Sequence, residues 1–367
     1  MKIFGKYFAY HAKKSLGRFA VIAVMTLICM IPLLMEKVNT SYNDPDWFYV
    51  YRRYGAMLAD KFNSITVILC VLCTIIPILE FAGFHNRKNA DTMLSMPISR
   101  AKLVLVHFLN GAWQIVTLLT FYVSIYVGIL INDTKECLEI TNYGYTYDIK
   151  LFIPYYFTLI LTCMLMYSFF TLVFNFANNV TDGVVFVLTY IFAGMLFVDG
   201  LDMLLGKMFV GGYSENMLPY KLTIDVSSNF FDALMNDGKQ LKYAFGDGWI
   251  INDMIIPMII AAVGTAVFVA CLIWILARKK AEKIEGISNF PLGYAFLIPL
   301  YGISFSVLLF GGVHIPEFTI SSALILIAMI VGYMIYRRSF KIKIRDIIMI
   351  VLTVVVMFAA YPISQMF

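Results

Sequence analysis

Nine runs of mainly apolar residues constrain this chain more than any other feature. A helix needs about 20 such residues to cross the hydrocarbon core of a bilayer. Hydrophobic residues make up 61% of the 367-residue chain and charged residues only 14%, whereas soluble domains carry roughly 25% charged residues. We therefore predict an all-α polytopic membrane protein. The expected spans are residues 19–35, 64–84, 103–131, 152–177, 183–199, 254–277, 292–313, 318–336 and 347–364.

The distribution of charge predicts which side of the membrane each connecting segment faces. With the N-terminus inside, 18 of the 28 Lys and Arg residues fall on the cytoplasmic side. Of the 23 Asp and Glu residues, 17 fall on the opposite side or its edge. Because Lys and Arg favour cytoplasmic loops, we expect a multi-pass protein with a cytoplasmic N-terminus. The net charge of +5 then reflects topology and does not indicate nucleic-acid binding.

Residues 1–18 form a candidate interfacial helix before the first span. Phe4, Tyr7 and Phe8 recur at helical spacing, while most of the lysines fall on other faces. This pattern is typical of a helix that lies in the inner headgroup layer. An ordinary basic flank that sets topology is the simpler alternative.

Two outer segments, residues 36–63 and 200–252, are rich in aromatic, charged and turn-forming residues. An aromatic belt at the outer interface explains the first segment, and a lip over a substrate pathway is the alternative. The second is too small and too polar for an independent core. We expect it to pack on the outer mouth of the helical bundle.

The segment between the second and third spans, residues 85–102, reads HNRKNADTMLSMPISRAK. Apolar residues at helical spacing predict a short helix, Pro97 ends it, and Ser99 can cap the long helix that follows. Basic residues at both ends would hold the segment at the lipid headgroups. It could therefore present a small amphipathic helix to a cytoplasmic partner while both ends stay anchored in the bilayer.

Few residues point to catalytic or metal chemistry. No GxxxxGK[ST] phosphate loop occurs, so we do not expect this chain to hydrolyse nucleotides. Cys70 and Cys73 form a CxxC inside a span, where core packing is the expected role. The histidines are far apart in the sequence: His11, His85, His107 and His314. We expect no metal site, no cofactor and no enzymatic activity in this chain.

Polar side chains inside the spans are candidates for function, because ionisable groups are expensive in a membrane. Glu80 is near the inner end of the second span, and an ion pair with Arg87 or Lys88 would brace the bend into the cytoplasmic helix. Polar side chains also mark one face of the third span: Asn110, Gln114, Thr117 and Ser124. Hydrogen bonds between helices explain that face, and the lining of a polar substrate path is the alternative.

The segment RKNADTMLSMPISRAKLVLVHFL, residues 87–109, resembles the coupling helix and following motif of ABC-2-type permeases, the membrane subunits of type V ABC exporters. Residues 1–18 resemble the elbow helix of that family, and residues 19–280 resemble its six-span core. The family's ATPase is likewise carried by another chain. Residues 281–367 depart from the six-span pattern by two or three extra spans. They resemble a Gram-positive subgroup linked to antimicrobial peptides or cell-wall stress.

The resemblance implies a transport complex in a bacterial cytoplasmic membrane. It would contain two ATPase subunits, which carry ATP and Mg²⁺, and a second permease that is identical or related. The residues that would contact or fix the ATPase are Arg87, Lys88, Asn89, Asp91, Met93, Leu94, Ser95, Met96 and Arg100. The cargo would be an amphipathic peptide, antibiotic or lipid-like molecule. A sensory or resistance component that binds such a ligand without bulk transport is the alternative, and an ion-coupled transporter is a third.

Overall fold

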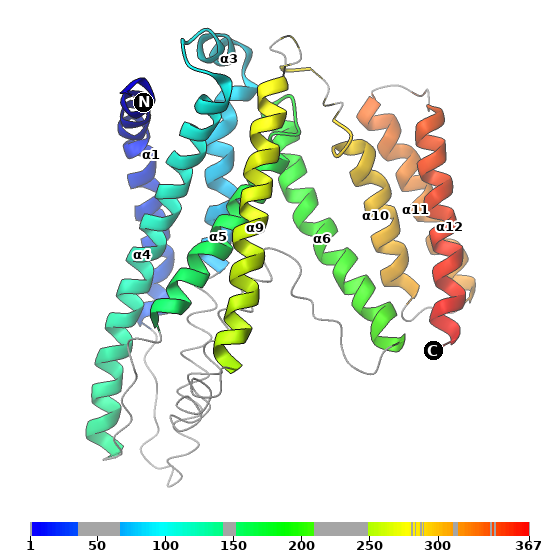
Figure 1. Cartoon of the computed structure of the whole chain (residues 1–367). Coiled ribbons are helices and arrows are strands. Elements are labelled where there is room, and N and C mark those ends of the chain that lie inside the picture. Colours follow the sequence, from blue (N-terminus) through cyan, green and yellow to red (C-terminus); the bar gives the residue numbers. More distant parts are fainter. Residues whose placement is uncertain are drawn as a thin grey trace. The chain divides into compact units, whose positions relative to one another are not determined.

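The computed structural model is entirely helical in its regular elements over the part of the chain that it describes (Figure 1). The described residues are 2–35, 67–141, 152–208, 249–279, 282, 284–286, 288, 290–310, 315–337, 340 and 343–366. A helix satisfies its backbone hydrogen bonds internally, which hydrocarbon surroundings require. The predicted fold class is confirmed at this level.

Each of the nine predicted spans coincides with a helix among the described residues. The helices are α1 (Lys2–Met35), α4 (Arg100–Thr141), α5 (Phe152–Phe174), α6 (Val180–Met208), α9 (Trp249–Arg278), α10 (Tyr294–Phe310), α11 (Ile315–Arg337) and α12 (Ile344–Met366). The second span is helical over residues 67–81 and continues into the 3-10 turn η1 (Ala82–His85).

Four helical stretches of the described chain are long and apolar enough to cross a membrane: Val67–His85, Arg100–Ile125, Tyr156–Phe174 and Met258–Arg278. Shorter apolar helical stretches occur at Val180–Gly194, Tyr294–Ser306 and Ser322–Tyr336. By length and composition, the chain is an α-helical membrane protein.

Several helices extend past their predicted limits, and α9 begins at Trp249, before the predicted start at residue 254. α1 runs unbroken through residue 18, where the sequence predicted a boundary between an interfacial helix and a span. Gly17 weakens a helix by about 1 kcal/mol, but no proline lies near this predicted boundary. α4 and α6 both continue into segments predicted as outer loops. The outer segment 36–63 and most of 200–252 lie outside the described residues, and the expectations for them stay predictions.

The chain divides into two compact units. The first consists of Met1–Phe81, Met96–Leu172 and Pro219–Arg278, and the second of Ala82–Ser95, Val173–Leu218 and Lys279–Phe367. The C-terminal helices therefore share a unit with α6 and with the short helix that follows the second span.

In the first unit, α4 packs against both α1 and α9, and Gly111 allows α5 to approach it closely. A Cβ atom at Gly111 would overlap the Tyr167 hydroxyl and lie 3.1 Å from Ile76 Cγ2. The Tyr167 hydroxyl donates to the backbone carbonyl of Phe108 at 3.1 Å. Tyr167 is fully buried, so its ring has no room to move away.

In the second unit, α10 packs against α6, α11 and α12. Pro299 lies inside α10 and has no N–H, so it leaves the carbonyl of Ala295 without its usual helical donor. The hydroxyl of Tyr333 on α11 donates to that carbonyl at 3.4 Å. A tyrosine from the neighbouring helix thus replaces the backbone donor that the proline lacks.

Replacing Gly111 with alanine tests the close packing of α4 and α5. We expect G111A to lower the thermal unfolding midpoint of the purified protein, because overpacking a tight site costs about 1–3 kcal/mol. The matched control is G128A in the same helix, where nothing lies within 4 Å of the added Cβ. An unchanged midpoint for G111A would show that this contact is looser than described.

Candidate functional site

The predicted cytoplasmic helix is present as α3, Arg87–Leu94. Asn86 is its N-cap and accepts a hydrogen bond from the backbone N–H of Asn89 at 3.4 Å. At the other end, the Ser95 N–H donates to the Asp91 carbonyl at 3.1 Å. Residues 95–99 are not helical, which agrees with the predicted break at Pro97. Both ends of α3 are therefore capped by local side-chain or backbone bonds.

The apolar face of α3 is turned toward its own chain. Ala90 is 1% exposed and Met93 is half-buried. The Met93 side chain reaches Gly83 of η1, where an added Cβ would lie 2.9 Å from the Met93 Cε. The side chain of Leu94 is outside the described residues.

The face of α3 that remains accessible is polar. Its exposed residues are Arg87, Lys88, Asn89, Asp91 and Thr92, and the C-cap Ser95 is exposed as well. The resemblance to ABC-2 permeases implies that Met93 and Leu94 would contact an ATPase, and this stays a prediction. The exposed side chains of α3 are mainly charged and amide groups, whereas Met93 lies against Gly83 of η1.

Two further predicted coupling residues follow α3. Met96 is half-buried and Arg100 is exposed. Arg100 begins α4, directly after Ser99, whose carbonyl accepts from the Leu103 N–H at 3.0 Å. The Arg100 guanidinium donates to the carbonyl of Ala277 at 3.3 Å. A cation at the C-terminal turn of α9 is favourable because that end of a helix carries partial negative charge.

A segment after α9, which we call the clamp (Lys279, Glu285 and Ser288), holds α3 to the turn that precedes α6. The Arg87 N–H donates to Glu285 Oε1 at 3.0 Å. The Glu285 N–H in turn donates to the Asn178 carbonyl at 2.9 Å, and the Asn178 N–H donates to Ser288 Oγ at 2.8 Å. A continuous set of hydrogen bonds therefore joins the first residue of α3 to the turn before α6.

Lys279, the remaining residue of the clamp, has a side-chain amine with a lowered pKa. Its Nζ donates to the Ala177 carbonyl and lies 3.4 Å from His85 Nδ1. Burial lowers the pKa of Lys279 to about 7, since removal from water disfavours the charged form. A neutral amine can still donate to the Ala177 carbonyl.

The lowered pKa of Lys279 predicts a pH dependence of stability. Between pH about 7 and its ordinary pKa near 10.5, the unfolded chain holds this proton and the folded chain does not, so stability rises with pH. Unfolding midpoints measured from pH 7 to 10 should rise more steeply for the natural protein than for K279M. Parallel curves for the two proteins would contradict this assignment.

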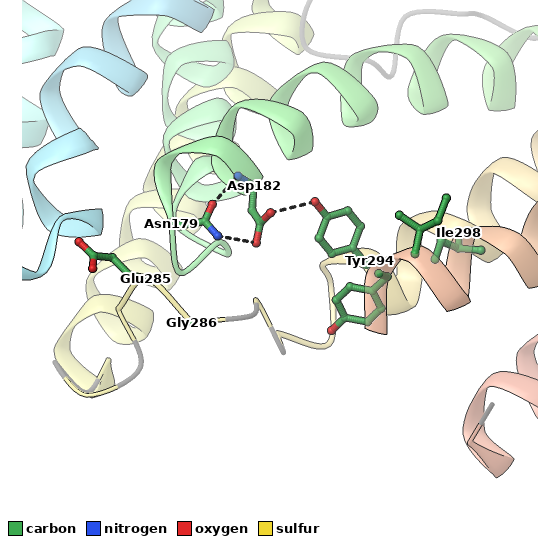
Figure 2. A pocket seen from close by; sticks show the side chains of 9 residues that line it. Asn179, Asp182, Glu285, Gly286, Tyr294 and Ile298 are labelled. Carbon is green, nitrogen blue, oxygen red and sulfur yellow. Dashed lines mark hydrogen bonds between the residues drawn. The ribbon is translucent and has the colours of Figure 1, made fainter. Parts of the chain in front are cut away.

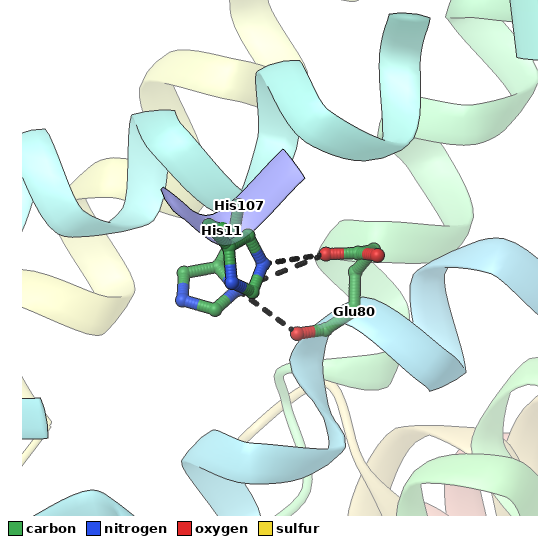
Figure 3. A group of neighbouring side chains, drawn as sticks. All are labelled: His11, Glu80 and His107. Atoms are coloured by element: carbon green, nitrogen blue, oxygen red, sulfur yellow. Dashed lines mark hydrogen bonds and ion pairs between the residues drawn. The ribbon is translucent and has the colours of Figure 1, made fainter. Parts of the chain in front are cut away.

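The second cluster of functional candidates surrounds Glu80 and is called here the Glu80 hub (Figure 3). Glu80 is 4% exposed. Its Oε2 lies 2.9 Å from His11 Nε2, and its Oε1 accepts from Arg18 Nη2 at 3.1 Å and from Gln114 Nε2 at 3.1 Å. His107 Nδ1 lies 3.1 Å from the Glu80 backbone carbonyl. The hub therefore ties together α1, the second helix and α4.

The partners of Glu80 correct one prediction from the sequence. We expected an ion pair with Arg87 or Lys88, which are the nearest basic residues along the chain. In the structure, the Glu80 carboxylate contacts His11 and Arg18 of α1 instead. Arg18 also donates to the Leu79 carbonyl at 2.8 Å. Its guanidinium therefore binds the end of the second helix through both the Glu80 carboxylate and the Leu79 carbonyl.

Two of the four candidate path residues on α4 make hydrogen bonds between helices, whereas Ser124 bonds within its own helix, to the Thr120 carbonyl at 2.7 Å. Gln114 belongs to the Glu80 hub, and Asn110 Nδ2 donates to Ser15 Oγ on α1 at 3.1 Å. Thr117 is exposed and bonds within its own helix, to the Trp113 carbonyl at 2.8 Å. Helix-to-helix bonding thus accounts for Asn110 and Gln114, and a polar substrate path stays a prediction.

Sequence reasoning missed the meeting of His11 with His107, whose ring centroids are 4.0 Å apart. A signal was present in the helical spacing. His11, Ser15 and Arg18 repeat every three or four residues, as a single helix face requires. The polar residues of α4 repeat in the same way: His107, Asn110 and Gln114.

The Glu80 hub contains a set of side chains that could hold a metal ion. His11, Glu80 and His107 each offer one ligand atom, and these atoms lie within 4.8 Å of one another. Two imidazoles and a carboxylate suit zinc or iron. The Arg18 guanidinium already supplies positive charge to the same carboxylate. We therefore interpret the hub as a brace between helices.

Replacing Glu80 with glutamine tests the hub. Removing one member of a buried ion pair is destabilising, but Arg18 is 43% exposed and can turn toward water. We expect E80Q to lose about 1–2 kcal/mol of unfolding free energy, measured by thermal or denaturant unfolding. E282Q is the control, because Glu282 is exposed. If E80Q and E282Q lose the same unfolding free energy, Glu80 does not brace the helices as we interpret it.

No family model, no curated protein and no solved structure matches this chain.

Proposed function

We propose that this chain is the membrane subunit of an ATP-driven exporter of the ABC-2 type, and that α3 receives force from a separate ATPase. The observation that carries the proposal is the hydrogen-bonded path from α3 through Glu285 to Asn178. A helix that is held in this way moves together with the clamp and with the turn that precedes α6.

The local structure of α3 suits a lever. A helix of 8 residues is too short to be stable alone in water. Here Asn86 caps it, Ala90 and Met93 pack on its own chain, and Glu285 binds its first N–H. These contacts favour a fixed orientation in which the polar face is available to a partner.

Displacement of α3 would pass to the transport helices through the clamp. Asn178 directly precedes Asn179, whose carbonyl accepts from the Gly183 N–H at 3.1 Å in the first turn of α6. α6 packs against α10. A push on α3 would therefore reach two long helices of its unit. Switching between two packed arrangements of helices is a common way to open a path.

ATP binding and hydrolysis would take place on the partner chains, because this sequence has no phosphate loop. We propose two ATPase subunits, each with ATP and Mg²⁺, and a second permease that is identical or related. The proposed setting is a bacterial cytoplasmic membrane with the N-terminus and α3 on the cytoplasmic side, as the distribution of Lys and Arg favours. The proposed cargo is amphipathic.

Charge reversal on the polar face of α3 tests the proposal. Asp91 is exposed, and its backbone carbonyl, not its carboxylate, accepts from Ser95. D91R should therefore leave α3 folded. We expect it to reduce the amount of P-loop ATPase that co-purifies with the tagged chain from native membranes, and to reduce ATP turnover of the purified complex by about tenfold.

The control is K343E, a charge reversal at another exposed position. Co-purified ATPase would be identified and quantified by mass spectrometry, with the unfolding midpoint of each variant as a check on folding. If D91R retains as much ATPase and turnover as K343E, α3 is not the contact, and the proposed role of this segment is wrong.

A further inference from the structure

A cavity of about 560 Å³ lies in the second unit, among the start of α6, the start of α10, the end of α11 and the clamp (Figure 2). This volume falls within the range of small-molecule sites, about 300–1,000 Å³. The lining residues are Asn179, Asp182, Glu285, Gly286, Tyr294, Ile298, Gly332, Ile335 and Tyr336.

The charge of this lining favours a cation. Two carboxylates, Asp182 and Glu285, belong to it, and none of the described lining residues is basic. A helix N-terminus normally attracts anions, but here Asp182 occupies the first turn of α6, and its N–H donates to Asn179 Oδ1 at 2.6 Å. An anionic ligand would therefore meet two like charges.

The Asp182 carboxylate is held in a fixed position. It accepts from Asn179 Nδ2 at 3.0 Å, from Ser288 Oγ at 2.7 Å and from the Tyr294 hydroxyl at 3.0 Å. Figure 2 shows it pointing toward Tyr294, with Glu285 lying farther from that ring. The side chain nearest the aromatic wall is thus a preorganised negative group.

Two tyrosine rings form that aromatic wall. Tyr294 and Tyr336 have ring centroids 4.7 Å apart and are tilted by 38°. Tyr336 donates to the Ser288 carbonyl at 2.8 Å, so both hydroxyls are engaged and both rings are oriented. Aromatic faces beside a carboxylate are the usual surroundings of an alkylammonium group.

The other side of the lining is apolar. It is formed by Ile298, Ile335 and Gly332. A Cβ atom at Gly332 would be 3.7 Å from Ile298, an ordinary contact, so the absence of a side chain there leaves space in the cavity. A ligand that fills the site would need a charged end and a hydrocarbon end.

We infer that this cavity binds an amphipathic organic cation, with an ammonium group beside the Asp182 carboxylate and the two tyrosine rings and a short hydrocarbon chain against Ile298 and Ile335. The chemistry is shared by free alkylamines and by the ammonium headgroup of phosphatidylethanolamine. Binding at this site does not require the proposed transport function, because only the residues that line the cavity would make the contacts.

Binding of hexyltrimethylammonium to the full chain tests the inference. The protein would be held in nanodiscs of phosphatidylglycerol, with radiolabelled probe and equilibrium dialysis. We expect saturable binding of one probe per chain, beyond the partitioning into empty nanodiscs. Hexyl sulfate and hexan-1-ol, with the same hydrocarbon chain but a negative or neutral end, should show partitioning only.

Two substitutions locate the bound probe. G332L should fill the apolar side and weaken binding by at least about tenfold, equal to about 1.4 kcal/mol, whereas the matched G332A adds one methyl group and should retain binding. D182N removes the charge and should also weaken binding. Unfolding midpoints check that each variant is folded. If D182N does not fold, the comparison of G332L with G332A still tests whether the probe binds in this cavity.

Binding of all three probes alike, or equal affinity of G332L and G332A, would overturn the inference. Nanodiscs that contain phosphatidylethanolamine identify the source of the ligand. Competition by this lipid supports the site as a headgroup site, and undiminished probe binding supports it as a site for a free amine.

Discussion

The hydrocarbon core of a membrane offers no water to polar groups, and this constraint shapes the described part of the chain. Backbone groups are satisfied within helices, and several hydroxyls bond to carbonyls of the preceding turn, as Thr171 does to Tyr167. A carboxylate cannot be satisfied within its own helix. Glu80 therefore draws in side chains from α1 and α4, and the three helices become one braced group.

Different interactions stabilise the interior of each unit. In the first, a part-buried ion pair and a close approach at Gly111 hold long helices side by side. In the second, backbone and hydroxyl groups of the clamp hold the turn before α6. Hydrogen bonds between two backbone groups do not depend on side-chain identity, but Lys279, Glu285 and Ser288 each use a side chain. The Glu285 carboxylate joins α3 to the clamp, so this residue decides whether α3 is connected to the turn before α6.

The strain at Glu285 supports its structural importance. Its φ angle is 68°, a left-handed conformation that non-glycine residues seldom adopt. Glycine would remove the strain but also the carboxylate that binds the Arg87 N–H. A glutamate in this conformation combines a sharp turn with a hydrogen-bond acceptor.

The sequence predicted the helices and α3 well because their signals are local. Run length and composition place a span, and apolar spacing with Pro97 predicts a short helix and its end without reference to the rest of the chain. Partners distant in the sequence were not predictable in the same way. Arg87 and Lys88 were expected at Glu80 because they are near in sequence, yet both are exposed, whereas His11 is 69 residues away.

The cavity could not be predicted from the sequence either, because the residues that line it are far apart along the chain. Its lining comes from separate segments, and none of them carries a motif. Asp182 and Gly332 are 150 positions apart in the sequence, and only the packing of α6, α10 and α11 makes them neighbours of one space. Residues of this kind can be recognised from sequence only after the contacts between helices are known.

The proline in α10 has a consequence for how the C-terminal helices can move. Separation of α11 from α10 would strip the Ala295 carbonyl of the Tyr333 hydroxyl and leave it bare in lipid, where an unsatisfied group costs several kcal/mol. The helical pair is therefore expected to tilt or translate as a single body, with any bending confined to Pro299 itself.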